Sequence, residues 1–312
     1  MTCFKKPKKQ LTTMEKTKYK YHLTPYAGRG SRTTCPNCKR QHCFSLYIDS
    51  ENRPAGPEYG VCDHKKECGY RRYPSGKIDN SAFEPVQIEK ADPVYYTRQD
   101  VANYTAGKLD NNLCKFLLTD CALDVQRLKK VLRDYCVGSV NGGIIFWQID
   151  EQYLIHRGKV MWYNPDGHRT KILSGDGTEH GKIKAMWQFL KRDRKFEPEM
   201  CYFGQHLITL YPGKSIVLVE SEKTAIIGAY FIPKYNWIAT LSLNNFNAHR
   251  LNFLKEFQKA VIVCPDKDGY YKWAEQTEKI KRLMPELKIR VNDFIENGSG
   301  KEDLADLLLK KE

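Results

Sequence analysis

Four cysteines in the first quarter of the chain have the spacing of a zinc site. Two residues separate Cys35 from Cys38, and five separate Cys62 from Cys68, with the second pair beginning 24 residues after Cys38. Two such pairs that meet across a hairpin offer four thiolates to a tetrahedral Zn²⁺ ion. We therefore predict a structural zinc ribbon over residues 21–73, closed by metal because so short a segment buries little core.

Three neighbouring residues compete for these ligand positions. His64 lies between Cys62 and Cys68 and could replace one thiolate, which the spacing leaves open. His42 and Cys43 precede an alternating segment that predicts a strand, and we interpret Cys43 as a packed residue. Nothing in the pattern indicates a catalytic ion, which would need an open coordination position.

Basic and aromatic residues surround the cysteines. Residues 1–40 contain eleven Lys and Arg against one acid, Glu15, and the whole chain carries a formal charge of +14. Tyr26, Phe44, Tyr47 and Tyr73 interleave with arginines. Rings for stacking and cations for the backbone are typical of proteins that bind single-stranded nucleic acid. The aperiodic residues 1–20 predict a basic disordered tail, for which a merely solubilising role is the alternative.

A second set of chemically capable residues is acidic. Glu220 follows the apolar run Ser215–Val219, and Asp266 and Asp268 follow the apolar run Ala260–Cys264. If both runs are neighbouring parallel strands, the three carboxylates converge at one edge of the sheet. Such a cluster repels itself unless it holds a hard cation such as Mg²⁺, whose chemistry with phosphate oxygens is phosphoryl transfer. Isolated acids at strand ends are the alternative.

The elements that must position these acids alternate between strands and helices from residue 211 to residue 312. This alternation, with short apolar strands, predicts an α/β domain with a mostly parallel sheet. The expected strands are Ser215–Val219, Trp237–Thr240, Ala260–Cys264 and Lys288–Val291, and the expected helices are Glu222–Phe231, Ala248–Gln258, Trp273–Met284 and Glu302–Lys310.

The middle of the chain predicts a mixed α+β domain over residues 94–210, preceded by a linker over residues 74–93 that is rich in Pro, Ser and charge. Helical spacing indicates two helices, and a meander of three strands ends at the turn of residues 164–167. The expected helices are Asn112–Leu118 and Val125–Tyr135, and the expected strands are Gly143–Ile149, Tyr153–His156 and Lys159–Tyr163.

The residues around Glu220 and Asp266 carry a resemblance to a known family. The segment VESEKTA of residues 219–225, followed by the Asp266-x-Asp268 pair, resembles the toprim domain of bacterial primases, topoisomerases and some nucleases. The resemblance implies that Glu220 is a general acid or base and that Asp266 and Asp268 bind Mg²⁺. The later segment GKEDLAD resembles the acidic segment that closes primase toprim domains, which implies a further acid at Asp303.

The order of the segments extends the resemblance. The cysteine segment looks like the template-binding ribbon of phage and bacterial primases, so the chain resembles the zinc-ribbon and toprim proteins of mobile elements and phages. The resemblance also implies that four basic residues contact template or nucleotide, namely Lys159, Arg169, Lys171 and Lys223. For the first three of these, the alternative is a hairpin with a solvated charged face.

The chain departs from this family in two respects. Residues 239–245 contain no glycine, whereas toprim proteins of this kind have a glycine-rich loop there for close approach to phosphate. The sequence also contains no P-loop, so the resemblance implies a separate helicase as partner. Three functions follow: a primase-like nucleotidyltransferase that uses nucleoside triphosphates, a non-catalytic accessory protein that binds DNA, and a toprim nuclease. Whether the strand bound is DNA or RNA stays open.

Composition sets outer limits on these functions. Apolar residues make up 41% and charged residues 28% of the 312, which is typical of a folded globular chain. No apolar stretch approaches the roughly 20 residues of a membrane helix, and no apolar run follows the basic start as in a secretory signal. The 11 cysteines are therefore expected to be reduced, and the expected compartment is the cytoplasm.

Overall fold

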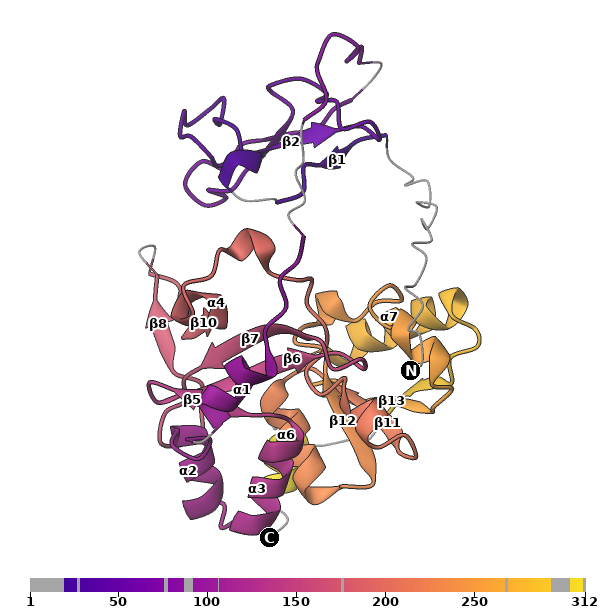
Figure 1. The fold of residues 1–312 in the computed structure, drawn as a ribbon. Coiled ribbons are helices and arrows are strands. Elements are labelled where there is room, and N and C mark those ends of the chain that lie inside the picture. The colour runs from indigo at the N-terminus through magenta and orange to yellow at the C-terminus, as the bar shows by residue number, and fades with distance from the viewer. Residues whose placement is uncertain are drawn as a thin grey trace, which may run out of the picture. The chain divides into compact units, whose positions relative to one another are not determined.

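The computed structural model describes residues 20–26, 29–75, 78–86, 92–105, 107–174, 177–266, 269–292 and 304–310. The predicted basic tail, apart from Lys20, and the acids Asp268 and Asp303 lie outside these residues. The chain forms two compact units that divide between residues 92 and 93, shown in Figure 1. Within the described residues, none of the helices is both long enough and apolar enough to cross a membrane.

The first unit is a small antiparallel sheet built around cysteines. Its strands lie in the order β1-β2-β3-β4, and Phe44 of the second strand pairs with Cys62 of the third. Gly60 is required beside this pair, because a Cβ atom there would lie 2.6 Å from the Phe44 ring. The strands are β1 (His22–Leu23), β2 (Phe44–Ile48), β3 (Gly60–Cys62) and β4 (Arg71–Arg72).

The second unit begins with three helices and an antiparallel sheet of order β10-β7-β6-β5. Asn111 and Asp124 cap two of the helices, because their side chains accept backbone N–H groups of the first turn. The elements are α1 (Arg98–Thr105), α2 (Asn112–Thr119), α3 (Val125–Asp134), β5 (Gly138–Val140), β6 (Gly143–Ile149), β7 (Ile155–Met161), the hairpin β8 (Lys171–Leu173) with β9 (Glu179–Gly181), β10 (Ile183–Ala185), α4 (Met186–Phe189) and α5 (Leu207–Leu210).

A four-stranded parallel sheet completes the second unit, in the order β12-β11-β13-β14. The predicted parallel sheet is therefore confirmed, while the boundary predicted at residue 211 stays a prediction. The elements are β11 (Ser215–Val219), α6 (Glu222–Phe231), β12 (Tyr235–Ala239), β13 (Val261–Val263), α7 (Tyr270–Leu283), β14 (Ile289–Val291) and α8 (Leu304–Leu309).

Three predicted elements differ from the structure. The strands expected at Tyr153–His156 and Lys159–Tyr163 are one strand, β7, in which Gly158 interrupts the apolar pattern because a Cβ there would lie 2.4 Å from Met186. The helix expected at Ala248–Gln258 is replaced by a turn and one short 3₁₀ helix, Asn252–Glu256. The Asn247 side chain accepts the Arg250 N–H as a helix cap would, but from residue 252 onward backbone N–H groups bond to carbonyls three residues back, as Leu254 does to Leu251, which is the 3₁₀ pattern.

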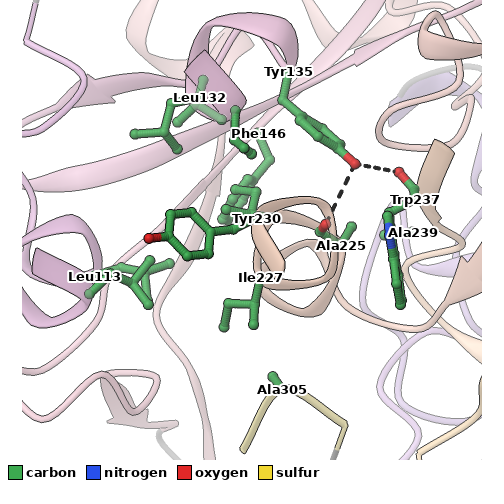
Figure 2. Packing of buried hydrophobic residues seen from close by; sticks show 14 of the residues in the cluster. Leu113, Leu132, Tyr135, Phe146, Ala225, Ile227, Tyr230, Trp237, Ala239 and Ala305 are labelled. Carbon is green, nitrogen blue, oxygen red and sulfur yellow. Dashed lines mark hydrogen bonds between the residues drawn. The ribbon is translucent and has the colours of Figure 1, made fainter. Parts of the chain in front are cut away.

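The two sheets of the second unit share one hydrophobic core around α6, and Figure 2 shows its packing. Phe146 of β6, Tyr135 after α3 and Ile227 of α6 are all fully buried in it. The Tyr135 hydroxyl donates to the Trp237 carbonyl of the edge strand β12 at 2.6 Å, and its oxygen lies 3.5 Å from the Ala225 carbonyl oxygen. One tyrosine therefore ties the helical layer to the edge of the parallel sheet.

We expect Tyr135→Phe to lower the free energy of unfolding of the second unit by about 1–2 kcal/mol, because the buried Trp237 carbonyl loses a hydrogen bond without gaining water. Urea denaturation followed by tryptophan fluorescence measures this change. Tyr271→Phe is the matched control, since Tyr271 is 78% exposed, and it should leave the midpoint unchanged. Equal midpoints for the two variants would contradict the role given to Tyr135.

Candidate zinc site and acidic sheet edge

Two tight turns present the four cysteines of the first unit. Cys35 and Cys38 lie on a turn in which Cys35 donates its N–H to Arg40 and accepts the N–H of Lys39, both at 3.0 Å. Cys62 ends β3, and Cys68 lies on a turn that Gly69 closes with a left-handed backbone at φ +62°. The five-residue spacing of the second pair is therefore the length of this turn.

The sulfur atoms lie at the separations that zinc requires. Cys35 Sγ is 3.7 Å from Cys68 Sγ, and Cys38 Sγ is 3.9 Å from Cys62 Sγ. All four sulfurs lie within 4.8 Å of one another. Zn–S bonds of about 2.3 Å in a tetrahedron place sulfurs about 3.8 Å apart, so the four thiols fit a closed structural zinc site.

A second ligand group overlaps the first. Cys43 Sγ is 4.0 Å and His64 Nδ1 is 3.8 Å from Cys62 Sγ, and with Cys38 these four also lie within reach of one ion. The two groups share Cys38 and Cys62, so one ion can use only one of them. The buried Cys43 thiol donates to the Arg40 carbonyl at 3.1 Å, which favours the packed role predicted for it.

Hydrogen bonding prepares Cys68 for metal. The Asn37 amide donates to Cys68 Sγ at 3.4 Å, and this bond, with a further one from the Tyr70 backbone, lowers the pKa of the thiol to about 6. Burial raises the pKa of Cys62 above its ordinary value. A bound Zn²⁺ would deprotonate that thiol by its own charge.

The aromatic residues of the ribbon are divided between core and surface. Tyr26 and Tyr73 are exposed, with the guanidinium groups of Arg32 and Arg71 lying 5.1 Å and 5.7 Å from their ring centroids. Phe44 is completely buried, so its predicted role as an exposed stacking residue is wrong. Its ring instead packs against the cysteines, where it contributes to the small core.

Parallel pairing brings two of the predicted acids to one edge of the second unit's parallel sheet. Strands β11 and β13 are neighbours, with Leu218 opposite Val263 in the pairing. The Cys264 N–H donates to the Leu218 carbonyl at 2.8 Å, which extends the register to the end of both strands. Glu220 and Asp266 therefore leave the sheet at the same edge.

The loop after β12 lies over this edge. Thr240 and Leu241 donate their N–H groups to the carbonyls of Val219 and Glu220, each at 2.9 Å. Leu241 has φ +72°, a left-handed conformation that glycine adopts without strain and leucine does not. The backbone shape of a glycine loop is thus present, but a leucine side chain lies beside Glu220 and packs on the core.

A buried ion pair lies next to the acidic edge. Lys159 Nζ from β7 is 2.5 Å from a Glu222 carboxylate oxygen, and the Glu222 side chain is only 1% exposed. Glu222 occupies the first turn of α6, whose N-terminus is capped by Ser221. Glu222 was not predicted as a site residue, because its partner Lys159 lies 63 positions away in the sequence. The signal that could have indicated it is its position two residues after Glu220.

The other predicted basic contacts lie apart from one another. Lys223 donates to the Gly167 carbonyl at 3.2 Å and so holds the turn of residues 164–167 against α6. Arg169 is exposed beside Tyr163, whose pKa burial raises well above the ordinary value. Lys171 forms an exposed pair with Glu179 on the β8–β9 hairpin. Of the four, Lys223 lies in the first turn of α6, and Lys159 contacts that turn from β7 through Glu222.

Two families match the sequence. Residues 111–267 match the family described as Domain of unknown function (DUF6371), so the chain belongs to this family. Residues 19–82 match a zinc beta-ribbon finger family, which agrees with the four-cysteine site. No curated protein sequence matches the chain.

Several solved primase structures are distantly similar. The primase fragment of the bacteriophage T7 primase-helicase protein shares 15% identity at a TM-score of 0.42, over 89% of this chain and 94% of that one. The E. coli primase catalytic core shares 12% at 0.43, over 68% and 74%. The Aquifex aeolicus primase shares 15% at 0.36, over 86% and 73%. Likenesses this distant assign no role to any residue.

We expect Cys68→Ser to abolish stoichiometric zinc and Cys43→Ser to retain about one zinc ion per chain, because only the first is a ligand in the four-thiol group. Atomic absorption of the purified variants gives the stoichiometry, and Cys114→Ser, a buried cysteine of the second unit, is the control. Zinc loss in Cys43→Ser with retention in Cys68→Ser would assign the overlapping group instead.

We expect Lys159→Met to destabilise the second unit by about 3 kcal/mol, because it leaves the buried Glu222 carboxylate without its cation. The double variant Lys159→Met with Glu222→Gln should recover most of this loss, since no buried charge remains. Chemical denaturation of the three proteins tests the pair, and a double variant no more stable than the single one would count against it.

Proposed function

We propose that this protein is a primase-like nucleotidyltransferase that holds single-stranded DNA on its zinc ribbon. The observation that carries the proposal is the neighbouring position of β11 and β13, because it delivers Glu220 and Asp266 to one sheet edge. In open parallel sheets ligands bind beyond the carboxyl ends of the strands. The proposal extends to Asp268 and Asp303 as further acids of the same edge.

The residues at the edge suit Mg²⁺ chemistry. Carboxylates are the ligands that Mg²⁺ prefers in proteins, and Asp266 with Asp268 would hold the ion. A bound Mg²⁺ would neutralise charge on the phosphates of a nucleoside triphosphate. Glu220 would accept the proton of the attacking hydroxyl, whose oxygen bonds to the α-phosphorus as pyrophosphate leaves.

The ribbon supplies the nucleic-acid part of the proposal. The exposed Arg71 beside Tyr73 gives a cation for phosphates, and the exposed rings of Tyr26 and Tyr73 give faces for bases, whereas Arg32 is paired with Asp63. Base stacking of this kind is tolerant of sequence, so it suits a single-stranded template. The ribbon would bind RNA by the same contacts, and a separate helicase would supply the open strand.

A second function is favoured by one observation. Leu241, and not a glycine, occupies the left-handed position beside Glu220, so the loop lacks the bare backbone that a glycine offers to a phosphate. This feature supports a non-catalytic accessory protein that binds DNA and carries an altered toprim domain. The two functions share the ribbon and differ only at the acidic edge.

Primer synthesis on single-stranded DNA separates the two functions. With labelled nucleoside triphosphates and Mg²⁺, we expect oligonucleotide products from the wild type and about 100-fold less from Asp266→Ala, because several kcal/mol of charge stabilisation are lost. Asp193→Ala, an acid of the same unit outside the edge, is the control. Absence of product from wild type, or equal product from Asp266→Ala, would reject the nucleotidyltransferase.

Strand binding reports on the ribbon alone. Cys35→Ser should lose salt-sensitive binding to a single-stranded oligonucleotide, whereas Asp266→Ala should keep it. If primer synthesis fails while this binding pattern holds, the accessory function stands.

A further inference from the structure

A cavity of about 600 Å³ opens in the second unit between α1, the end of α3 and the turn that joins β6 to β7. Its floor is apolar and buried, and is formed by Val101, Leu132, Val137, Ile149 and Ile155. Cavities of this size and character hold small organic ligands in other proteins. The cavity therefore has room for the ring system of such a ligand.

Three cations border the cavity. Arg98 comes from the start of α1, Lys108 from the segment after it, and Arg133 from the last turn of α3. Within the described residues no acidic side chain lines the cavity, and none of the three cations forms an ion pair. Three cations from separate elements around an apolar floor favour a ligand that carries negative charge beside an apolar body.

Tyr153 lies at the border of the cavity with a strained backbone conformation. Tyr153 has φ +63° and is 38% exposed, a left-handed conformation that costs a non-glycine residue about 1–2 kcal/mol. The Asp150 carboxylate fixes its turn by accepting the N–H groups of Gln152 and Leu154, and His156 Nε2 lies 2.8 Å from the same carboxylate. The turn is thus built to keep a ring at this place.

We propose that this cavity binds a nucleotide unit, with its base between the apolar floor and Tyr153 and its phosphates on Arg98, Lys108 and Arg133. Among the described lining residues the neutral side chains that could hydrogen-bond a base edge are Thr105, Cys136 and Tyr153, and the Thr105 hydroxyl already donates to the Ala102 carbonyl. We therefore expect binding to discriminate only weakly between bases. A free nucleoside triphosphate and the phosphorylated end of a strand share this chemistry.

The site is separate from the acidic edge. Ile155, in the cavity floor, begins β7, whereas Lys159 pairs with Glu222 four residues further along the same strand. The proposal does not depend on catalysis at that edge. Without a divalent cation the carboxylates there repel a triphosphate, so binding in magnesium-free buffer reports on the cavity.

The experiment is isothermal titration of the full-length zinc-loaded chain with ATP in magnesium-free buffer. We expect Arg133→Gln with Lys108→Gln to weaken ATP binding at least tenfold, and Ala102→Trp, which fills the cavity mouth from α1, to abolish it. Lys115→Gln is the matched control, because Lys115 is an exposed lysine of α2 away from the cavity. Its affinity should stay within twofold of wild type.

Three probes and one footprint complete the test. Adenosine, which lacks phosphates, should bind at least tenfold more weakly than ATP. If a 5′-phosphorylated octathymidylate binds more tightly than ATP, the ligand is the end of a strand. If ATP binds more tightly than the octathymidylate, the ligand is the free nucleotide. ATP should also protect Cys136, which lines the cavity, from N-ethylmaleimide in peptide mass spectrometry. Absence of binding by both phosphorylated probes, or unchanged affinity in the double variant, would overturn the proposal.

Discussion

The arrangement of the second unit depends on the burial of helix α6, which packs on β11 and β12 of the parallel sheet and against the helices α3 and α8. Seven of its ten residues are buried, among them Gly228, where a Cβ atom would lie 2.4 Å from the Trp237 ring. This close approach fixes the height of the helix over β12, and the Ser221 cap fixes where the helix begins. Because α6 starts two residues after Glu220 leaves β11, its packing also determines where that acid lies.

The same helix explains why the two sheets cannot be treated as independent layers. Lys159 reaches α6 from the antiparallel sheet and Tyr135 reaches the parallel one from the helical layer, so polar contacts cross the shared core at two places. A buried ion pair contributes little net stability, but it restricts how the layers can be joined. Lys159 is thereby committed to a carboxylate of the protein, which limits its freedom to contact a phosphate.

Much of the fold and part of the site follow from local sequence. The run Ser215–Val219 and the helix Glu222–Phe231 match the structure residue for residue, because a short apolar strand, a serine cap and a buried helix are all encoded locally. The four thiols were predictable from spacing alone. The pairing of Lys159 with Glu222 was not, since it depends on how distant strands stack. Nor was the loss of the helix at Ala248–Gln258, where backbone bonds from residue 252 onward join residues three apart instead of four.

The stability of the first unit depends on zinc, whereas that of the second unit depends on its apolar cores. The first unit has a core of a few residues around four sulfurs, so its folding equilibrium is linked to the free concentration of zinc. The second unit has extended apolar cores that contain no metal-binding group among the described residues. A fall in available zinc therefore acts on the first unit alone, and the cell's metal supply sets the fraction of molecules in which that unit is folded.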